Sequence, residues 1–224
     1  MKPDRQTKAT FVSAYALGTV KRWMDILASL SGLILAAPML GLAACFIYWD
    51  DGLPILYRAS RVGRTGIPFV MLKLRTMSRN ADQQGSSSTP EDDARITRPG
   101  RVLRKWKLDE VPQLFNVLKG HMSLVGPRPQ VQWAVDLYRP EERLLLSVRP
   151  GLTDFASIKF RNEGRILRGC ANPDLVYLRD IAPAKIDLGL RYVKTASLMT
   201  DVRIICMTLQ VALGGERSKE SDGY

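Results

Sequence analysis

The sequence predicts an α+β fold that is mostly helical, with a re-entrant N-terminal membrane helix, a small β-hairpin and amphipathic helices at the membrane interface. Three observations support this fold class. Residues 26–49 carry no charge, two short strand-like segments flank a glycine-containing turn, and helical periodicity dominates the second half of the chain. We expect an N-terminal membrane segment at 1–50, a folded domain at 51–214 and a solvated tail at 215–224.

The apolar segment reads ILASLSGLILAAPMLGLAACFIYW. At about 1.5 Å per residue, a helix of this length is sufficient to cross the hydrocarbon core of a bilayer. Trp23, Tyr48 and Trp49 lie at its ends, where interfacial aromatic residues are common. Pro38 in the middle removes a backbone donor and clashes with the preceding turn, so we expect the helix to break there.

Basic residues flank the apolar segment on both sides. They are Lys2, Arg5, Lys8, Lys21 and Arg22 before it, and Arg58, Arg61, Arg64, Lys73 and Arg75 after it. Because basic residues beside membrane segments favour the cytoplasm, neither side is suited to export. A helix that breaks at Pro38 and returns to the cytoplasmic face satisfies both flanks, and a simple spanning helix is the alternative.

Two other interpretations of the apolar segment fit less well. The motif LAAC at 42–45 resembles a bacterial lipoprotein cleavage box, but a signal peptide usually has about 15–30 residues. A buried helix of a soluble protein rarely runs for 24 residues without a charge. The membrane interpretation is therefore retained.

The remaining elements follow in order. Short strands are expected at 55–57 and 67–74, because Gly63 and Gly66 between them permit a turn. Residues 78–93 are polar with a serine run, which indicates a mobile loop, and 101–107 indicate a short basic helix or turn. Helices are expected at 111–119, 140–148, 174–181, 186–194 and 199–213, with Gly120 ending the first of them.

Composition narrows the function. The formal net charge of +11 favours an anionic partner, which is nucleic acid, an acidic membrane surface or a phosphorylated substrate. The widely spaced Cys45, Cys170 and Cys206 form neither a disulfide framework nor a CxxC pair, which suits a reducing cytosol. His121 is the only histidine, so a site with several histidine ligands is excluded.

Two adjacent carboxylates, Asp109 and Glu110, follow a basic stretch in the segment KLDEVPQLFNVLKG. Its six cations are Arg95, Arg98, Arg101, Arg104, Lys105 and Lys107. We expect Asp109 to cap the following helix, and the cations to keep it ionised and to attract phosphate. An isolated aspartate here would be an ordinary cap. A pair, however, can divide two tasks, one as nucleophile or metal ligand and the other as a proton-handling group.

Attack of a carboxylate on phosphorus brings anions together, and a divalent cation with arginines relieves the repulsion. Mg²⁺ needs only one or two protein carboxylates, because phosphate oxygens supply further ligands. Arg128, in the proline-framed GPRP loop, has a planar fork that bonds two phosphate oxygens. Arg75 in KLRTM and Arg104 are further phosphate-binding candidates, although a solvated surface charge is the alternative for Arg75.

Several further segments stand out beside the acidic pair and the apolar segment: KRWMDI, RVG, KLRTM, MSLVGPRP, RPGLT and SLMTDVRII. With these segments the chain resembles bacterial sugar transferases of the small monotopic phosphoglycosyl transferase type, over residues 20–213. The resemblance implies transfer of a sugar phosphate from a UDP-sugar to polyprenyl (undecaprenyl) phosphate, with release of UMP. It also implies Mg²⁺ dependence and a re-entrant helix at the cytoplasmic face of the bacterial inner membrane, in the first membrane step of surface glycan synthesis.

The resemblance also implies roles for single residues. Asp109 matches the nucleophile that forms a covalent phosphosugar intermediate and contacts Mg²⁺. Glu110 matches the residue that assists the polyprenyl phosphate acceptor, and Arg128 matches the phosphate-binding arginine. The expected partners are then a UDP-sugar, polyprenyl phosphate and anionic membrane lipid rather than nucleic acid, and the oligomeric state stays open, a homodimer included.

The chain departs from the family pattern at several positions. Ala37 precedes Pro38 where serine is frequent, His121 replaces a usual aspartate, KWK precedes LDE, and GLTDFASI departs from GLTG with a following glutamine. These departures leave the sugar open. A nucleic-acid binder would not explain the apolar segment or the acidic pair. A non-catalytic membrane scaffold or degenerate transferase is the remaining alternative, and the intact carboxylates and GPRP arginine argue against it.

Overall fold

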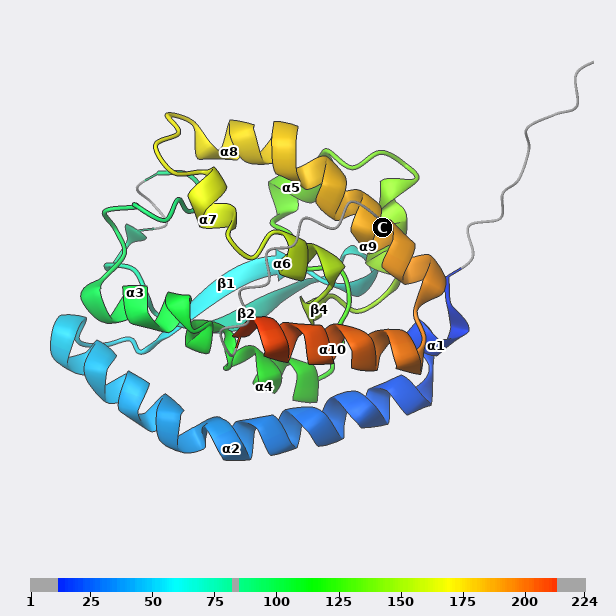
Figure 1. Cartoon of the computed structure of the whole chain (residues 1–224), viewed down its shortest axis with the longest axis horizontal. Coiled ribbons are helices and arrows are strands. Elements are labelled where there is room, and N and C mark those ends of the chain that lie inside the picture. Colours follow the sequence, from blue (N-terminus) through cyan, green and yellow to red (C-terminus); the bar gives the residue numbers. More distant parts are fainter. Residues whose placement is uncertain (1–11, 82–84, 213–224) are drawn as a thin grey trace, which may run out of the picture.

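A computed structural model describes residues 12–81 and 85–212 of the chain. The described residues form a mostly helical domain with two small sheets, and one long helix runs along its edge (Figure 1). This confirms the predicted α+β composition. The tail predicted at 215–224 and the basic residues before position 12 lie outside the described residues.

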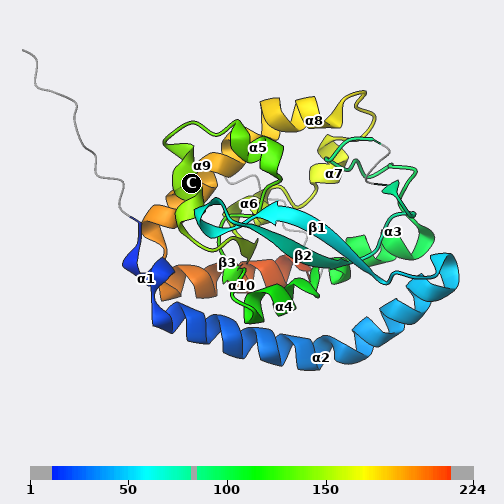
Figure 2. The same cartoon turned by 180° about the vertical axis from the view of Figure 1, so that it is seen from behind.

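The long helix α2 (Thr19–Asp51) follows the short helix α1 (Ala14–Leu17) and is continuous over 33 residues. Pro38 lies inside it, so the break expected at this proline is corrected to a bend. Both ends of α2 curve toward the same side, that of the folded domain (Figures 1 and 2). Because a proline removes one hydrogen bond and displaces a neighbouring carbonyl, it bends the axis of a long helix without ending it.

Most of the surface of α2 is apolar and exposed. Its large exposed side chains are Val20, Trp23, Leu27, Leu30, Ile34, Leu35, Met39, Leu42, Phe46, Tyr48 and Trp49. Only a narrow stripe that begins with Lys21, Asp25, Ser29 and Leu33 is buried against the domain. In the described part of the chain this is the one helix long and apolar enough to cross a membrane. An exposed apolar surface of this extent indicates contact with a membrane or a partner.

Polar contacts hold both ends of α2 to the domain. Near its start, the Lys21 ammonium lies 2.5 Å from Asp201 of α10 (Leu198–Ala212) and donates to the Val125 carbonyl at 3.0 Å. Beyond its end, Arg75 donates to the carbonyl groups of Asp51 (3.0 Å) and Gly52 (2.7 Å). A buried ion pair with these additional hydrogen bonds fixes geometry, because breaking either partner leaves an unpaired buried charge.

The predicted hairpin is confirmed. Strands β1 (Leu56–Val62) and β2 (Pro68–Leu74) pair antiparallel around the short turn η1 (Arg64–Gly66), and Gly66 adopts a φ of 81°. The first strand is longer than expected. Asn116 attaches the hairpin to helix α4 (Gln113–Leu118), since its side chain donates to Val70 O (2.6 Å) and accepts from Leu72 N (2.9 Å).

The basic segment forms helix α3 (Arg98–Lys105), as predicted, and it is followed by the 3₁₀ turn η3 (Leu108–Glu110) and helix α4 (Gln113–Leu118). The predicted cap is wrong, because α4 begins only after Pro112 and Asp109 makes no capping hydrogen bond. The left-handed Lys107 (φ 57°) opens a turn whose own backbone bonds already use the N–H groups of residues 110 and 111. Gly120 (φ 83°) follows α4 as predicted.

A parallel strand pair that the sequence did not predict carries the GPRP loop. Strands β3 (Ser123–Val125) and β4 (Gly151–Thr153) pair through Ser123 and Gly151 and through Val125 and Thr153. A side chain at Gly126 would come within 2.7 Å of the Arg149 carbonyl oxygen, and one at Gly151 within 2.2 Å of Gly126 N. Only glycine therefore permits this contact.

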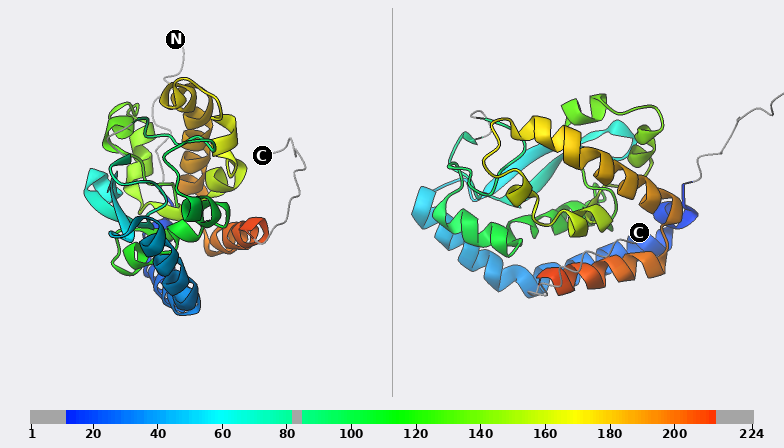
Figure 3. Two further views of the ribbon diagram at one scale, coloured as in Figure 1. Left: turned by 90° about the vertical axis from the view of Figure 1, so that its left-hand side faces the viewer. Right: turned by 45° about the horizontal axis from the view of Figure 1, so that its top comes forward.

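The other described elements complete the domain: α5 (Gln132–Asp136), η4 (Glu142–Ser147), α6 (Phe155–Lys159), α7 (Glu163–Ile166), α8 (Pro173–Val176), η5 (Tyr177–Ile181) and α9 (Ala182–Thr195). The helices expected at 174–181, 186–194 and 199–213 are confirmed, and the one at 140–148 is a shorter 3₁₀ turn. α10 lies at the α2 end of the domain, and α8 lies at the opposite end (Figure 3).

The polar loop predicted at 78–93 contains no α-helix or β-strand among its described residues, as expected. It is anchored at several points. Ser87 N and Ser88 N donate to the Asp174 carboxylate at 3.0 and 2.7 Å, and Glu91 N donates to Gly164 O at 2.9 Å. These contacts place the loop against α7 and α8, where it forms one wall of the cleft described next.

Candidate active site

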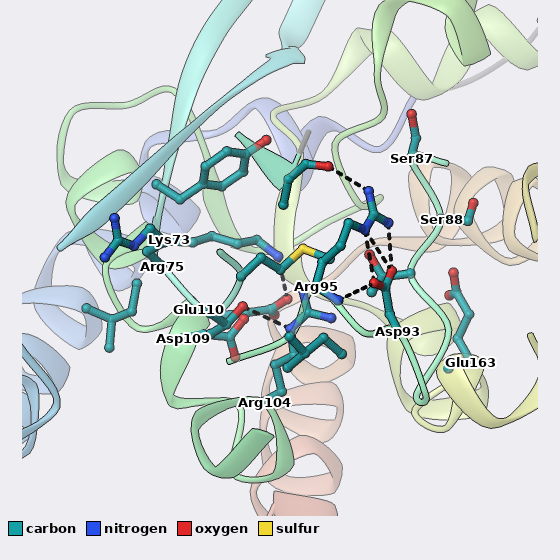
Figure 4. A pocket seen from close by; sticks show the side chains of 18 of the residues that line it. Lys73, Arg75, Ser87, Ser88, Asp93, Arg95, Arg104, Asp109, Glu110 and Glu163 are labelled. Carbon is teal, nitrogen blue, oxygen red and sulfur yellow. Dashed lines mark hydrogen bonds and ion pairs between the residues drawn. The ribbon is translucent and has the colours of Figure 1, made fainter. Parts of the chain in front are cut away.

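A cleft of about 2160 Å³ lies between the hairpin, the 78–93 loop, α3 and the GPRP loop. Among the described residues, fifteen lysine and arginine side chains line it, against six aspartate and glutamate side chains. Such an excess of positive charge in a concave site attracts anionic ligands and favours phosphate groups. Figure 4 shows Lys73, Asp109 and Glu110 together in this cleft, with Arg104 close by.

Both predicted carboxylates line this cleft, in different surroundings. Asp109 is only 6 % exposed, and its Oδ1 atom is buried without a hydrogen-bond partner among the described residues. Glu110 accepts a hydrogen bond from Lys73 Nζ at 3.0 Å and is also paired with the Arg128 guanidinium. The turn η3 thus presents one carboxylate whose oxygen is free for a ligand and one whose charge is already neutralised.

Electrostatics separate the two carboxylates further. Burial and the negative charge of Glu110 raise the pKa of Asp109 above its usual value, and the neighbouring cations offset this only in part. Burial thus opposes the ionisation of Asp109, whereas Lys73, Arg104 and Lys107 favour it, as the sequence predicted for cations at this site. Burial also favours the neutral form of Glu110, but Arg128, Lys73 and Lys107 together hold the pKa of Glu110 well below its usual value.

Arg128 is placed by the β3–β4 pair. The GPRP loop is held by hydrogen bonds from Gly151 N to Pro127 O (2.9 Å) and from Gly126 N to Thr153 O (3.1 Å). One terminal nitrogen of Arg128 donates to Leu152 O at 3.2 Å, and the other pairs with Glu110. The guanidinium is therefore oriented by the main chain on one side and by Glu110 on the other.

The two other predicted arginines also line the cleft. Arg104 donates to the Thr76 hydroxyl at 2.9 Å, and its charge acts on Asp109, so it belongs to the same cluster. Arg75 is buried, and its contacts with residues 51 and 52 give it a structural role at the end of α2. Its Nη1 atom has no hydrogen-bond partner in the described part of the chain. Phosphate binding by either arginine stays a prediction.

Sequence reasoning did not identify Lys73 as a site residue, and it placed Lys107 only among the six cations before the acidic pair. Lys73 is a single charge within the otherwise apolar strand PFVMLKL, and this was the available signal for it. Lys107 approaches the carboxylates through its left-handed backbone, which residue type does not reveal. His121, the departure from the family aspartate, packs its ring against Phe69 with centroids 5.8 Å apart and does not line the cleft.

The residues present are compatible with a Mg²⁺ ion bound together with substrate. Within the described ranges no cluster of three or more histidine, cysteine, aspartate or glutamate side chains is arranged to hold a metal. Mg²⁺ bound by substrate phosphates needs only one or two protein carboxylates. The buried Asp109 oxygen without a partner meets this requirement.

The sequence matches known proteins over most of its length. The family model described as bacterial sugar transferase matches residues 16–215. The chain is 40 % identical over 192 residues to a UDP-glucose:undecaprenyl-phosphate glucose-1-phosphate transferase of Caulobacter vibrioides, covering 84 % of this chain and 68 % of the relative. It is 35 % identical over 207 residues to the exopolysaccharide production protein ExoY of Sinorhizobium fredii, covering 86 % and 84 %.

A longer relative shows the same match. The chain is 35 % identical over 199 residues to a UDP-N-acetylgalactosamine-undecaprenyl-phosphate N-acetylgalactosaminephosphotransferase of Aeromonas hydrophila, covering 88 % of this chain and 44 % of the relative. The chain thus spans less than half the length of that protein. The names of the Caulobacter and Aeromonas relatives both include undecaprenyl phosphate and differ in the sugar.

Proposed function

Because the chain belongs to the bacterial sugar transferase family, we propose that it transfers a sugar phosphate from a UDP-sugar to undecaprenyl phosphate, with release of UMP. Its product would begin a surface glycan such as an exopolysaccharide. The observation that carries the proposal is the pair of the buried Asp109 and the half-buried Glu110 in a basic cleft, where Arg128 and Lys73 make ion pairs with Glu110. A membrane scaffold would have no use for a buried carboxylate oxygen without a partner.

Asp109 is the proposed nucleophile. Its carboxylate attacks the phosphorus that carries the sugar; the new Asp109 oxygen–phosphorus bond forms while the bond to UMP breaks, and UMP leaves with the electron pair. Burial removes water that would otherwise compete, and Arg128 and Arg104 stabilise the charge on the phosphate oxygens. Mg²⁺, held by Asp109 and by the substrate phosphates, would supply further positive charge that reduces the repulsion between the anions.

Glu110 is proposed to act in the second half of the reaction. It is oriented by Lys73 and Arg128, so that it can hold these two cations in place for the phosphate of the acceptor. An acceptor oxygen then attacks the phosphosugar phosphorus. The bond to Asp109 breaks, and Asp109 recovers its negative charge for the next turnover.

We further propose that α2 is re-entrant at the cytoplasmic face of the bacterial inner membrane. Ion pairs hold both of its ends to one domain. Lys21 pairs with Asp201 at the start of the helix, and Asp51 pairs with Arg75 at its end. A helix that spans the bilayer would place these contacts on opposite sides. Apolar side chains are also exposed on α10, on α4 and on α3 with its C-terminal cap, and we propose that they add to the membrane contact: Leu198, Met199, Val202, Leu209, Phe115, Val102 and Trp106.

The proposed reaction predicts UMP release that depends on undecaprenyl phosphate. Purified protein in detergent or nanodiscs is supplied with Mg²⁺ and a panel of UDP-sugars, and UMP is measured with and without the lipid. We expect sustained release with at least one sugar, and none above background with Asp109→Asn protein prepared in parallel. Release with no sugar of the panel would favour the scaffold alternative.

The proposed topology predicts that both flanks of α2 are inaccessible from the periplasm. In a variant with Cys45, Cys170 and Cys206 replaced by serine, single cysteines are introduced at the exposed positions Leu17 and Ile67. A membrane-impermeant maleimide applied to intact spheroplasts should label neither, and permeabilised spheroplasts should label both. Labelling of one position alone in intact spheroplasts would establish a spanning helix instead.

A further inference from the structure

A second cavity of about 430 Å³ adjoins the active-site cleft at Arg128. The two share six lining residues: Arg128, Gln130, Ala134, Ser157, Tyr177 and Lys185. Its volume lies within the range of about 300–1,000 Å³ that is typical of small-molecule sites. A group attached to a phosphate held by Arg128 can therefore extend from the cleft into this cavity.

Asp154 forms the wall of this cavity next to Arg128 and is only 3 % exposed. Its Oδ1 atom accepts a hydrogen bond from Ser157 N at 2.6 Å and thereby caps α6. Burial raises the pKa of Asp154, although Ser157 and the charges of Arg128 and Lys185 lower it in part. The cap uses one carboxylate oxygen, so the side chain retains capacity to accept a further hydrogen bond from a ligand.

Ser157 follows Asp154 by one turn and lines both the cleft and the cavity. Its hydroxyl oxygen is buried and makes no hydrogen bond among the described residues, although it lies close enough to Asp154 to lower the pKa of that carboxyl group. Buried hydroxyl groups without partners are unfavourable and rare in proteins. A partner that arrives with the substrate would satisfy it.

Both residues stand where this chain departs from its relatives' usual motif. Asp154 replaces the last glycine of the family pattern GLTG, within the segment GLTDFASI that also holds Ser157. The two residues are adjacent in space, and both line the second cavity beside Arg128. Polar side chains next to the group that binds the phosphate are suited to discriminate between sugars, because a site built to hydrogen-bond a hydroxyl group rejects a sugar that lacks it.

We infer that Asp154 and Ser157 form the sugar subsite, where they bind hydroxyl groups of the hexose in the UDP-sugar and select among hexoses. The inference rests on the proposed function, because it is the phosphate at Arg128 that places the sugar. The hexose is bonded directly to that phosphate, whereas the nucleoside lies one phosphate further away and has the larger cleft available. A carboxylate accepts hydrogen bonds and a hydroxyl both donates and accepts them, which matches neighbouring hydroxyl groups of a pyranose.

Two conservative substitutions test the subsite. Ser157→Ala removes a hydroxyl that makes no hydrogen bond among the described residues and that acts only on the pKa of Asp154, and Asp154→Asn keeps the capping oxygen, so both proteins should unfold close to the wild-type temperature. Ser29→Ala is the matched control, because the Ser29 hydroxyl is equally buried and without a partner but lies in α2, outside both cavities. The kcat/KM for UMP release is measured with UDP-glucose, UDP-galactose, UDP-N-acetylglucosamine and UDP-N-acetylgalactosamine, and the Kd of UDP by calorimetry.

We expect Ser157→Ala to lower kcat/KM for the preferred UDP-sugar by about threefold to tenfold, as for one neutral hydrogen bond. Asp154→Asn should lower it by about tenfold to a hundredfold, as for a charged acceptor. The ratio between sugars should change in both variants, while the Kd of UDP stays within about twofold and Ser29→Ala behaves as wild type.

Two results would overturn the inference. An equal loss for all four sugars would mean that these residues only position α6, and a matching loss of UDP affinity would assign the cavity to the nucleotide. Failure of the proposed function gives a different result, because wild-type protein would then release no UMP from any UDP-sugar.

Discussion

Asp109→Asn is expected to abolish both turnover and the covalent phosphosugar intermediate while the fold survives. The amide is uncharged and a poor nucleophile, so attack on phosphorus stops. The side chain caps no helix, and the backbone bonds of residues 107–111 hold the η3 turn by themselves. Asparagine also has nearly the same volume as the buried carboxylate whose pKa is raised, so we expect little change in the thermal unfolding midpoint.

The adjacent substitution Glu110→Gln is the control for this result. It leaves the nucleophile in place but removes the negative charge that pairs with Lys73 and Arg128. The intermediate should therefore form, while transfer to the lipid slows. The measurement is radiolabelled sugar phosphate trapped on the protein without acceptor, in wild type and both variants. Initial-rate kinetics should be ping-pong, with UMP leaving before the lipid binds.

Two outcomes would contradict the covalent mechanism. The first is label trapped on Asp109→Asn protein, which would place the nucleophile elsewhere. The second is kinetics that require both substrates to be bound before UMP leaves, which would indicate direct transfer. In the second case Asp109 would be at most a metal ligand.

The large features of the fold follow from patterns that are long or chemically distinctive. Twenty-four uncharged residues predicted the long apolar helix α2, and two strand-like segments around Gly63 and Gly66 predicted the hairpin. The acidic pair was identified because adjacent carboxylates after six cations are unusual. Asp109, Glu110, Arg104 and Arg128 are indeed brought into one cleft.

The errors concern features that depend on backbone geometry. The bend at Pro38 was predicted as a break, because the sequence does not show that contacts at both ends hold α2 to the domain. The cap at Asp109 failed because Lys107 adopts a left-handed conformation and starts a 3₁₀ turn. The strands β3 and β4 have three residues each, which is too short for an alternating pattern to be recognised.

The sugar subsite shows a third kind of limit. The sequence shows that the segment GLTDFASI departs from the family motif, but it does not show what Asp154 and Ser157 in that segment contact. Only the structure shows that the two side chains lie beside the GPRP arginine and line a second cavity. The sequence alone therefore could not predict that these two residues line a cavity beside Arg128.

Arg128→Lys is expected to lower kcat/KM by about tenfold to a hundredfold, although it keeps the positive charge. The guanidinium divides its two terminal nitrogens between Leu152 O and Glu110, and on the proposed mechanism its remaining N–H groups bind the reacting phosphate. A lysine ammonium is a single point of charge on a flexible stem and cannot make both contacts. Arg128→Ala should be more severe, because Lys73 is then the one bonded partner left to Glu110 within the described part of the chain.

The matched control is Arg179→Lys, because Arg179 is exposed, pairs with its neighbour Asp180 and lines neither cavity. It should leave the rate unchanged, since an exposed ion pair contributes little. The phosphate role of Arg128 further predicts that UDP binds its lysine variant more weakly, whereas the thermal unfolding midpoint changes little. Near-normal rates in both Arg128→Lys and Arg128→Ala would show instead that the GPRP loop only supports the β3–β4 pair, and phosphate binding would then fall to Arg104 and its neighbours in the cleft.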